Sequence, residues 1–279
     1  MTPLVSTSWL AERLGDANVV VLDATLPPVG VTPVVDTRGR SVERHIPGAV
    51  FFDIEELSDH TSGLPHTMPL AEAFAKSMAA LGVGDGMTVV VYEQEGVFSA
   101  PRAWWMLRSF GVADVRILDG GLRAWVAAGL PTEAGEVQRD ATRFTARLKA
   151  GAVRDFGEIQ EAIAAGRQIL DARSAGRFSG ALPEPRAGLR SGHMPGATSV
   201  PFTELVTDGK LKGEAELRAY FEAKGVDLEE PVVTTCGSGV TAAVIALGLE
   251  IVGAKDVGLY DGSWAEYASR PEAVIVSGS

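Results

Sequence analysis

The chain has 279 residues, of which 46% are hydrophobic and 22% are charged, a composition typical of a globular protein of roughly two domains. Its formal net charge of −11 argues against nucleic acid or an anionic membrane as the main partner, because both require a basic surface. An anionic substrate would therefore have to be bound locally, by particular arginines.

The chain contains one cysteine, Cys236, so it cannot form an internal disulfide. This fits a reducing compartment. The first residues, MTPLVSTSWLAERLG, lack the basic and apolar regions of a secretory signal, and no stretch is apolar enough to span a bilayer. We therefore expect a cytoplasmic protein with no membrane partner.

Short β-branched runs alternate with amphipathic stretches along the whole chain. In the first half, the strands expected are VVVLD, TVVVY and VRIL, and the helices are AEAFAKSMAAL, APRAWWMLRSF and LRAWVAA. In the second half, the strands expected are QILD, PVVTT and VGLY, and the helices are FGEIQEAIAAG, EAELRAYFEAKG and TAAVIALGLEIVG. Apolar strands separated by helices predict a parallel sheet covered by helices on both faces.

The second half repeats the order of the first. Asp23 in VVVLDAT matches Asp171 in QILDARS, and His45 in RHIPGAVFF matches His193 in GHMPGATSVPF, both at an offset of 148 residues (171 − 23 and 193 − 45). Later matches, including Glu93 with Cys236 (236 − 93), have offsets of 142 to 143 residues. This pattern indicates a duplicated domain with loop insertions. We expect domains at residues 1–130 and 151–279, joined by a polar, turn-rich linker at 131–150.

Cys236 directly follows the predicted strand PVVTT. In open α/β sheets, ligands bind beyond the carboxyl ends of the strands. Gly237, Ser238 and Gly239 are small enough for consecutive backbone N–H groups to turn inward and form a concave nest at the start of the next helix. Such a nest stabilises a thiolate. A lone cysteine is often just a small buried hydrophobe, but these neighbours predict a nucleophile.

Three other chemistries do not fit this loop. A nucleotide P-loop requires a lysine after the last glycine, and Val240 follows Gly239. A cysteine phosphatase requires an arginine near the end of the loop, where this chain has Val240, Thr241 and two alanines. A zinc site requires several close cysteine or histidine ligands, and there is no second cysteine. We expect neither a metal nor an organic cofactor.

The loop CGSGVTA and the repeated H-[IM]-P-G-A turn resemble the two-domain rhodanese-type sulfurtransferases, and the loop is most similar to the branch that uses 3-mercaptopyruvate. The resemblance extends over nearly the whole chain, including RHIPGAVFFDI, SAPRAWWML, LDGGLRAW, GRFSGALPEPR and YDGSW. It implies an α/β fold of two tandem rhodanese-like domains. The first would be catalytically silent, because Glu93 stands where the second has Cys236.

The resemblance also implies the reaction. Sulfane sulfur would move from 3-mercaptopyruvate through a persulfide on Cys236 to cyanide or to a thiol acceptor such as reduced thioredoxin, with release of pyruvate. Such an enzyme is expected to be a monomer. Arg177 and Arg186, in GRFSGALPEPR, match the arginines that the family uses to hold the carboxylate and keto group of the donor, a task that suits the planar guanidinium. The loop residues Gly237, Gly239, Val240 and Thr241 would complete the substrate site.

By the same resemblance, Ser238 ends a Ser–His–acid arrangement that handles protons, with His66 in the middle. The acid position matches Glu55, where close relatives have aspartate. Glutamate is one methylene longer, so the bond from Glu55 to His66 departs from the family pattern. His45 and His193 occur in both the silent and the active half, which indicates a structural role in fixing the turns.

The donor is inferred from the residues next to the cysteine. The thiosulfate-using branch carries basic residues there, whereas Gly237 and Ser238 are uncharged. This difference favours 3-mercaptopyruvate. A thiosulfate sulfurtransferase stays open as an alternative, as does a non-catalytic persulfide carrier or redox-sensing module. Arg177 and Arg186 argue against the carrier, because a module that receives sulfur from a protein needs no clamp for a small carboxylate.

Overall fold

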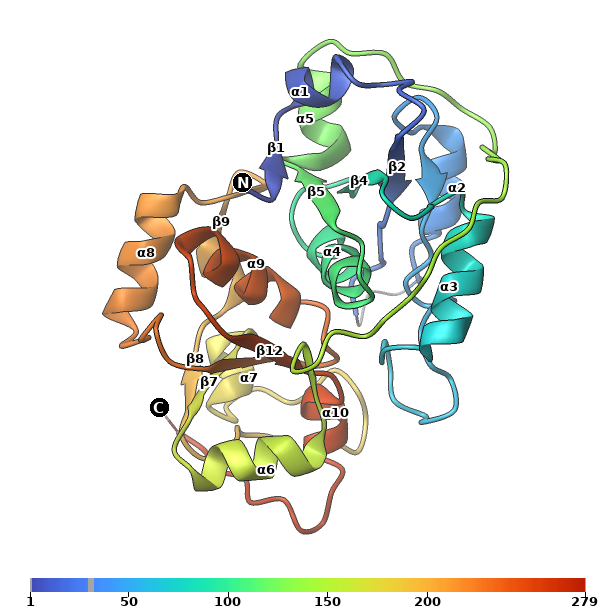
Figure 1. Cartoon of the computed structure of the whole chain (residues 1–279). Helices are drawn as coiled ribbons and strands as arrows, with labels where there is room; N and C mark the ends of the chain where they lie inside the picture. Colours follow the sequence, from blue (N-terminus) through green and yellow to red (C-terminus); the bar gives the residue numbers. More distant parts are fainter. Residues whose placement is uncertain (1, 30–32, 279) are drawn as a thin grey trace. The chain divides into compact units, whose positions relative to one another are not determined.

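The computed structural model describes residues 2–29 and 33–278 (Figure 1). The backbone contacts divide the chain into two compact units. The first unit takes its described residues from 1–58, 68–149 and 208–210, and the second takes them from 59–67, 150–207 and 211–279. Two short segments, 59–67 and 208–210, therefore pack with the opposite half of the sequence.

The first unit is built on a five-stranded sheet whose order is β1-β5-β4-β2-β3, with every pair parallel. The predicted strands and helices of this half are confirmed, whereas the short strands β1 and β3 and the short helices α1 and α2 were not predicted. The strands are β1 (Leu4–Val5), β2 (Val19–Asp23), β3 (Val50–Phe51), β4 (Thr88–Tyr92) and β5 (Asp114–Leu118), and the helices are α1 (Thr7–Ala11), α2 (Thr37–Glu43), α3 (Ala71–Ala80), α4 (Ala100–Ser109) and α5 (Gly121–Ala127).

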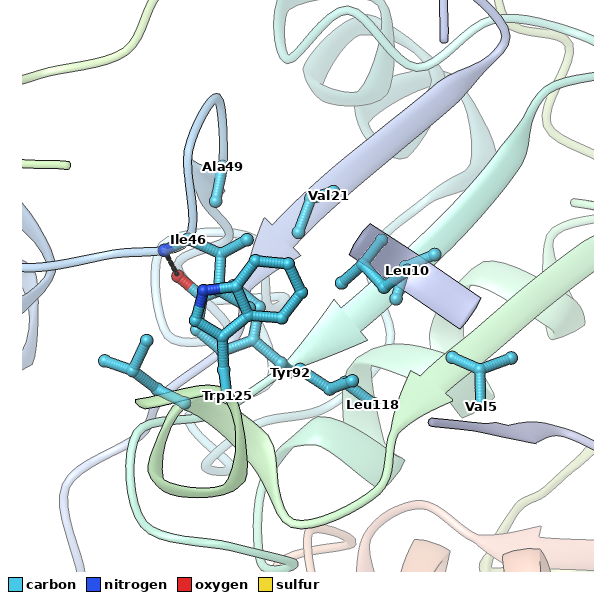
Figure 2. Packing of buried hydrophobic residues seen from close by; sticks show 10 residues of the cluster. Val5, Leu10, Val21, Ile46, Ala49, Tyr92, Leu118 and Trp125 are labelled. Carbon is cyan, nitrogen blue, oxygen red and sulfur yellow. Dashed lines mark hydrogen bonds between the residues drawn. The ribbon is translucent and has the colours of Figure 1, made fainter. Parts of the chain in front are cut away.

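Trp125 on α5 lies in a core cluster of the first unit (Figure 2). It is fully buried beside Val21, Tyr92 and Leu118, which come from three neighbouring strands. Its indole N–H donates to the carbonyl of Pro131 at 2.7 Å, so no buried polar group is left unsatisfied by the ring. Truncation of such a residue to alanine typically costs about 3–5 kcal/mol of stability.

The second unit repeats this topology, with sheet order β6-β12-β11-β7-β8 and parallel pairs throughout. Its predicted strands and helices are also confirmed, whereas β6, β8, α7, α10, a 3-10 turn and the small β9–β10 sheet were not predicted. The elements are β6 (Val153–Arg154), α6 (Phe156–Ala164), β7 (Gln168–Asp171), α7 (Ala175–Phe178), β8 (Ala197–Ser199), η1 (Phe202–Leu205), β9 (Val206–Thr207), β10 (Lys210–Leu211), α8 (Glu214–Ala223), β11 (Val232–Thr235), α9 (Ala242–Val252), β12 (Val257–Tyr260) and α10 (Ser263–Tyr267).

Helix α9, which follows the cysteine, is almost entirely buried. Gly248 in its middle allows a close approach to α8, since an added Cβ would meet the ring of Phe221 at 3.2 Å. The helix ends at Gly253, whose φ of 84° is the left-handed conformation usual at a helix C-terminus. Tight packing along α9 fixes the position of its N-terminus, where the cysteine loop arrives. In the part of the chain that the structure describes, no helix is long and apolar enough to cross a membrane.

The linker and the two histidine turns are held by backbone atoms. Residues 136–149 contain no helix or strand, and Thr142 donates its hydroxyl to the carbonyl of Val83 in the first unit at 2.7 Å. His45 Nδ1 lies 2.7 Å from the carbonyl of Ser41. His193 Nδ1 lies 2.9 Å from a carbonyl in the same way, that of Phe178. These bonds support the structural role that the repeat predicts for both histidines.

Candidate active site

Cys236 lies at the carboxyl end of β11, between Thr235 and the loop that leads to α9. We call residues 236–241 the cysteine loop. Helix α10 anchors it, since the N–H of Trp264 donates to the carbonyl of Cys236 at 2.9 Å and the N–H of Ala265 donates to the carbonyl of Gly237 at 3.0 Å. The cysteine is 2% exposed and is not bonded to another sulfur. The anchored carbonyls fix the direction in which the loop turns away from the sheet.

The rest of the loop presents backbone N–H groups. Within residues 2–29 and 33–278, no acceptor receives a hydrogen bond from the N–H groups of residues 237–241. Gly239 has a φ of 80°, a left-handed conformation that a residue with a side chain adopts only with strain. Unengaged N–H groups before a helix N-terminus form a site that favours an anion. The geometry supports the anion-binding nest that the sequence predicts.

Arg177 and Arg186 border this loop. A Cβ added to Gly237 would lie 3.0 Å from Arg177 Nη2 and 3.8 Å from Arg186 Nη1. The φ of Gly237 is not positive, so glycine is needed here for space rather than for backbone conformation. The residues directly after the cysteine, Gly237 and Ser238, carry no charge of their own. Both guanidinium groups lie beside the residue that follows the cysteine, so positive charge reaches the loop from Arg177 and Arg186.

Glu184 holds Arg177 in place. Arg177 donates from Nε to Glu184 Oε1 at 3.2 Å and from Nη2 to Glu184 Oε2 at 2.5 Å. The same carboxylate accepts a bond from Arg173 Nη1 at 2.9 Å. The side chain of Glu184 is 2% exposed, whereas that of Arg177 is 24% exposed. Glu184 was not among the predicted site residues, although its place in the motif GALPEPR, two positions before Arg186, was a signal.

Arg173 is a fully buried cation behind Glu184. It forms an ion pair with Asp171 at 2.7 Å, donates to the carbonyl of Gly192 at 2.8 Å, and its guanidinium lies 4.0 Å from the ring centre of Trp264. Burial on its own would lower the pKa of Arg173, but the carboxylates of Asp171 and Glu184 outweigh burial and raise the pKa above the ordinary value. Asp171 and Arg173 directly after an apolar strand were the sequence signal for this pair.

His66 and Ser238 are hydrogen-bonded. His66 Nδ1 lies 2.9 Å from Ser238 Oγ, although 172 positions separate them. Both side chains are buried, and both residues belong to the second unit because segment 59–67 packs there. His66 has a φ of 60°, which is uncommon for a residue other than glycine and is often found at functional positions.

The remaining predicted site residues occupy different environments. Glu55 is exposed in a turn of the first unit, where its carbonyl accepts the N–H of Ser58 at 3.1 Å. Its role as the acid partner of His66 stays a prediction.

Val240 is 4% exposed, and Thr241 is half-buried at the start of α9. Among the described residues, no group of three or more His, Cys, Asp or Glu side chains could hold a metal ion.

The first unit has a corresponding loop, residues 93–99, which we call the silent loop. It runs from β4 to α4 as the cysteine loop runs from β11 to α9. The carboxylate of Glu93 accepts hydrogen bonds from the N–H of Ser99 at 2.7 Å, from the hydroxyl of Ser99 at 2.6 Å and from the N–H of Phe98. Burial raises the pKa of Glu93 to about 7, although these bonds act in the opposite direction.

Comparisons with known proteins identify the family. The model of the rhodanese-like domain matches residues 6–128 and 155–270. The chain is 46% identical to 3-mercaptopyruvate sulfurtransferase of Escherichia coli K12 over 98% of both chains, and 45% identical to the Homo sapiens enzyme of that name over 99% of this chain and 95% of that one.

The fold agrees with a solved structure. The crystal structure of SseA from Escherichia coli, described as a 3-mercaptopyruvate sulfotransferase with the rhodanese fold, matches with a TM-score of 0.88 at 44% identity. The match covers 95% of this chain and 99% of that one. The chain therefore belongs to the rhodanese-like family and consists of two rhodanese-like domains in tandem.

Proposed function

We propose that this chain is a 3-mercaptopyruvate sulfurtransferase in which Cys236 carries the transferred sulfur as a persulfide. The observation that carries the proposal is the surroundings of the cysteine. Cys236 begins a loop of unengaged N–H groups, and two guanidinium groups lie beside Gly237. The loop suits a sulfur anion and the arginines suit the carboxylate of a small donor. The relatives that share nearly the full length of this chain bear the same activity in their names.

In the first half-reaction, the Cys236 thiolate attacks the sulfur of 3-mercaptopyruvate. An S–S bond forms, the C–S bond of the donor breaks, and its electron pair passes to the enolate of pyruvate. The enolate takes up a proton and leaves as pyruvate, while the outer sulfur keeps the hydrogen of the donor thiol. Arg177 and Arg186 hold the carboxylate and the keto group, where negative charge develops.

In the second half-reaction, an acceptor removes the outer sulfur. A thiolate or cyanide attacks that sulfur, the S–S bond breaks, and Cys236 leaves as a thiolate that is ready for the next donor. The acceptor in this proposal is reduced thioredoxin or a similar thiol. The pair of His66 and Ser238 would move the proton when the cysteine thiol is activated, with Glu55 as the acid that orients His66.

The organisation of the enzyme is part of the same proposal. We divide the chain into a silent domain at residues 1–130, a linker at 131–150 and a catalytic domain at 151–279, and we propose a monomer in the cytoplasm. The support for a silent first domain is Glu93, whose carboxylate fills the loop that holds the cysteine in the second. The support for a reducing compartment is the single, free cysteine.

Mass spectrometry tests the proposal directly. After the protein is mixed with 3-mercaptopyruvate, we expect one added sulfur atom on Cys236 and an equal amount of free pyruvate. A passive carrier would form no adduct with this donor. Because the residues after Cys236 are uncharged, we also expect kcat/KM to favour 3-mercaptopyruvate over thiosulfate by at least about tenfold. A preference for thiosulfate would make the chain a thiosulfate sulfurtransferase, for which the guanidinium groups beside Gly237 supply the positive charge.

A further inference from the structure

A row of four charged side chains runs from the end of β7 to the cysteine loop. Asp171 pairs with Arg173 at 2.7 Å, Arg173 with Glu184 at 2.9 Å, and Glu184 with Arg177 at 2.5 Å. The exposed fractions of the first three side chains are 0%, 0% and 2%. The signs alternate, so each charge has an opposite neighbour and the row is neutral as a whole.

Glu184 is the link between the buried and the exposed part of this row. Its Oε1 accepts from both Arg173 Nη1 and Arg177 Nε, and its Oε2 accepts from Arg177 Nη2. A carboxylate that accepts from two nitrogens along one edge of a guanidinium fixes the plane of that group as well as its position. Arg173 cannot move to release Glu184, because Asp171 and the carbonyl of Gly192 hold its other nitrogens.

The fixed guanidinium lies beside Gly237, the residue that follows Cys236. Arg177 Nη2, which bonds Glu184, is also the atom that would lie 3.0 Å from a Cβ on Gly237. Each Nη of arginine carries two hydrogens, so one bond to Glu184 leaves a second N–H for an anion next to the loop. An arginine on its own has many rotamers, and ordering it when the donor binds would cost free energy.

We infer that Glu184 is a positioning residue, held by Arg173, that fixes Arg177 for the carboxylate of the sulfur donor. The inference rests on the proposed function, in which Arg177 binds that carboxylate. Glu184 also places a negative charge near the donor, but Arg173 offsets this charge. The gain from a fixed Arg177 therefore exceeds the repulsion, and removing the carboxylate weakens donor use rather than improving it.

A double-mutant cycle tests the inference with 3-mercaptopyruvate as donor and cyanide as acceptor. Glu184→Gln should lower kcat/KM for the donor by about tenfold or more, whereas in an Arg177→Ala background it should change kcat/KM by less than about twofold. The rate at which cyanide discharges a preformed persulfide should stay the same in all four proteins. If Glu184 served only general stability, Glu184→Gln would lower the rates of both half-reactions, and it would do so equally with Arg177 present and in the Arg177→Ala background.

Two further variants keep the result unambiguous. Glu184→Asp keeps the charge but is too short to reach both arginines, so it should behave like Glu184→Gln; if it retains wild-type kcat/KM, the positioning role is overturned. Glu204→Gln is the control, since Glu204 joins Tyr220 and Lys224 in the same unit, and it should leave kcat/KM unchanged. Equal effects of Glu184→Gln in both backgrounds, or a higher kcat/KM, would also overturn the inference. Absence of donor turnover in the wild type would refute the proposed function instead.

Discussion

The cysteine loop and the silent loop show two uses of one backbone design. Both connect a central strand to a buried helix, at an offset of 143 residues between Cys236 and Glu93. In the silent loop, Glu93 occupies the N–H groups of Phe98 and Ser99 with its own carboxylate. In the cysteine loop, the N–H groups of residues 237–241 have no acceptor among the described residues. The two units thus share this loop design, and in the first unit the protein's own carboxylate occupies N–H groups of the loop.

The two loops also differ at their second residue, which is Gln94 in the silent loop and Gly237 in the cysteine loop. Gln94 of the silent loop donates to Asp23 Oδ2 at 3.0 Å and to the carbonyl of Arg44 at 3.1 Å, and so closes the space beside its loop. Gly237 of the cysteine loop leaves that space to Arg177. The missing side chain therefore lets Arg177 approach the cysteine loop.

Substitution of the first residue of each loop should give the largest difference in turnover between the two loops. Cys236→Ser should reduce turnover by at least about a thousandfold, because a hydroxyl fills the site but cannot carry a persulfide. Glu93→Gln, the matched change in the silent loop, should leave turnover within about twofold. Steady-state kinetics and circular dichroism check both variants. Residual activity above a few per cent in a folded Cys236→Ser protein would disprove the nucleophile.

Loss of either arginine should affect one half-reaction only. Arg177→Ala and Arg186→Ala should each lower kcat/KM for 3-mercaptopyruvate by roughly 2–4 kcal/mol in ΔΔG‡, as for a lost charged hydrogen bond. Discharge of preformed persulfide by cyanide should change far less. Stopped-flow measurement of each half-reaction distinguishes these outcomes, and equal damage to both would argue that the arginines serve the fold instead.

The buried carboxylate of the silent loop should make stability depend on pH. Glu93 has a pKa of about 7 in the folded protein and an ordinary value of 4.5, so the folded state binds the extra proton between these values. The free energy of unfolding therefore has its full value, as far as Glu93 is concerned, below about pH 4.5. It falls by about 3 kcal/mol as the pH rises to 7, because the unfolded chain loses this proton first. Glu93→Gln should remove this slope from calorimetric unfolding between pH 4.5 and 8. An unchanged slope would mean that other groups produce it.

A side chain added at Gly237 of the cysteine loop should have the smallest effect of these four predictions. Gly237→Ala places a Cβ 3.0 Å from Arg177 Nη2, so the guanidinium must shift by a few tenths of an ångström. We expect kcat/KM for the donor to fall by about tenfold, while discharge of the persulfide stays near the wild-type rate. The matched Gln94→Ala change should have no effect on either. Wild-type donor kinetics in Gly237→Ala would show that the close approach of Arg177 is unimportant.

The sequence predicted the repeated part of the structure well. The central strands, such as Thr88–Tyr92 and Val232–Thr235, are long apolar runs, and the helices between them have a clear period, so both follow from local pattern. The two-residue edge strand Leu4–Val5 was missed because a strand this short has no period. Its existence depends on pairing with Ile117 and Leu118, which lie far away in the sequence.

The cysteine loop could be predicted from residues that are neighbours in the sequence, whereas contacts between distant residues left no local signal. Cys236 was evident from its glycine-rich neighbours. The hold of Glu184 on Arg177 was not predicted, because it depends on a buried third residue, Arg173. The contact of His66 with Ser238 was expected only from the family resemblance, because it depends on how a distant segment folds back. Neither leaves a periodic trace in the sequence, because both arise from tertiary packing.

The exchange of segments 59–67 and 208–210 has a consequence for how the protein is made. As the ribosome synthesises the chain, His66 emerges 172 positions before Ser238, so its segment must wait unpartnered until the second half has been translated. A gene fragment that encodes only residues 151–279 would yield a catalytic half without this histidine. Each half of the duplicated sequence therefore lends a short segment to the other unit, so a boundary cut between the two halves would separate each unit from part of its own residues.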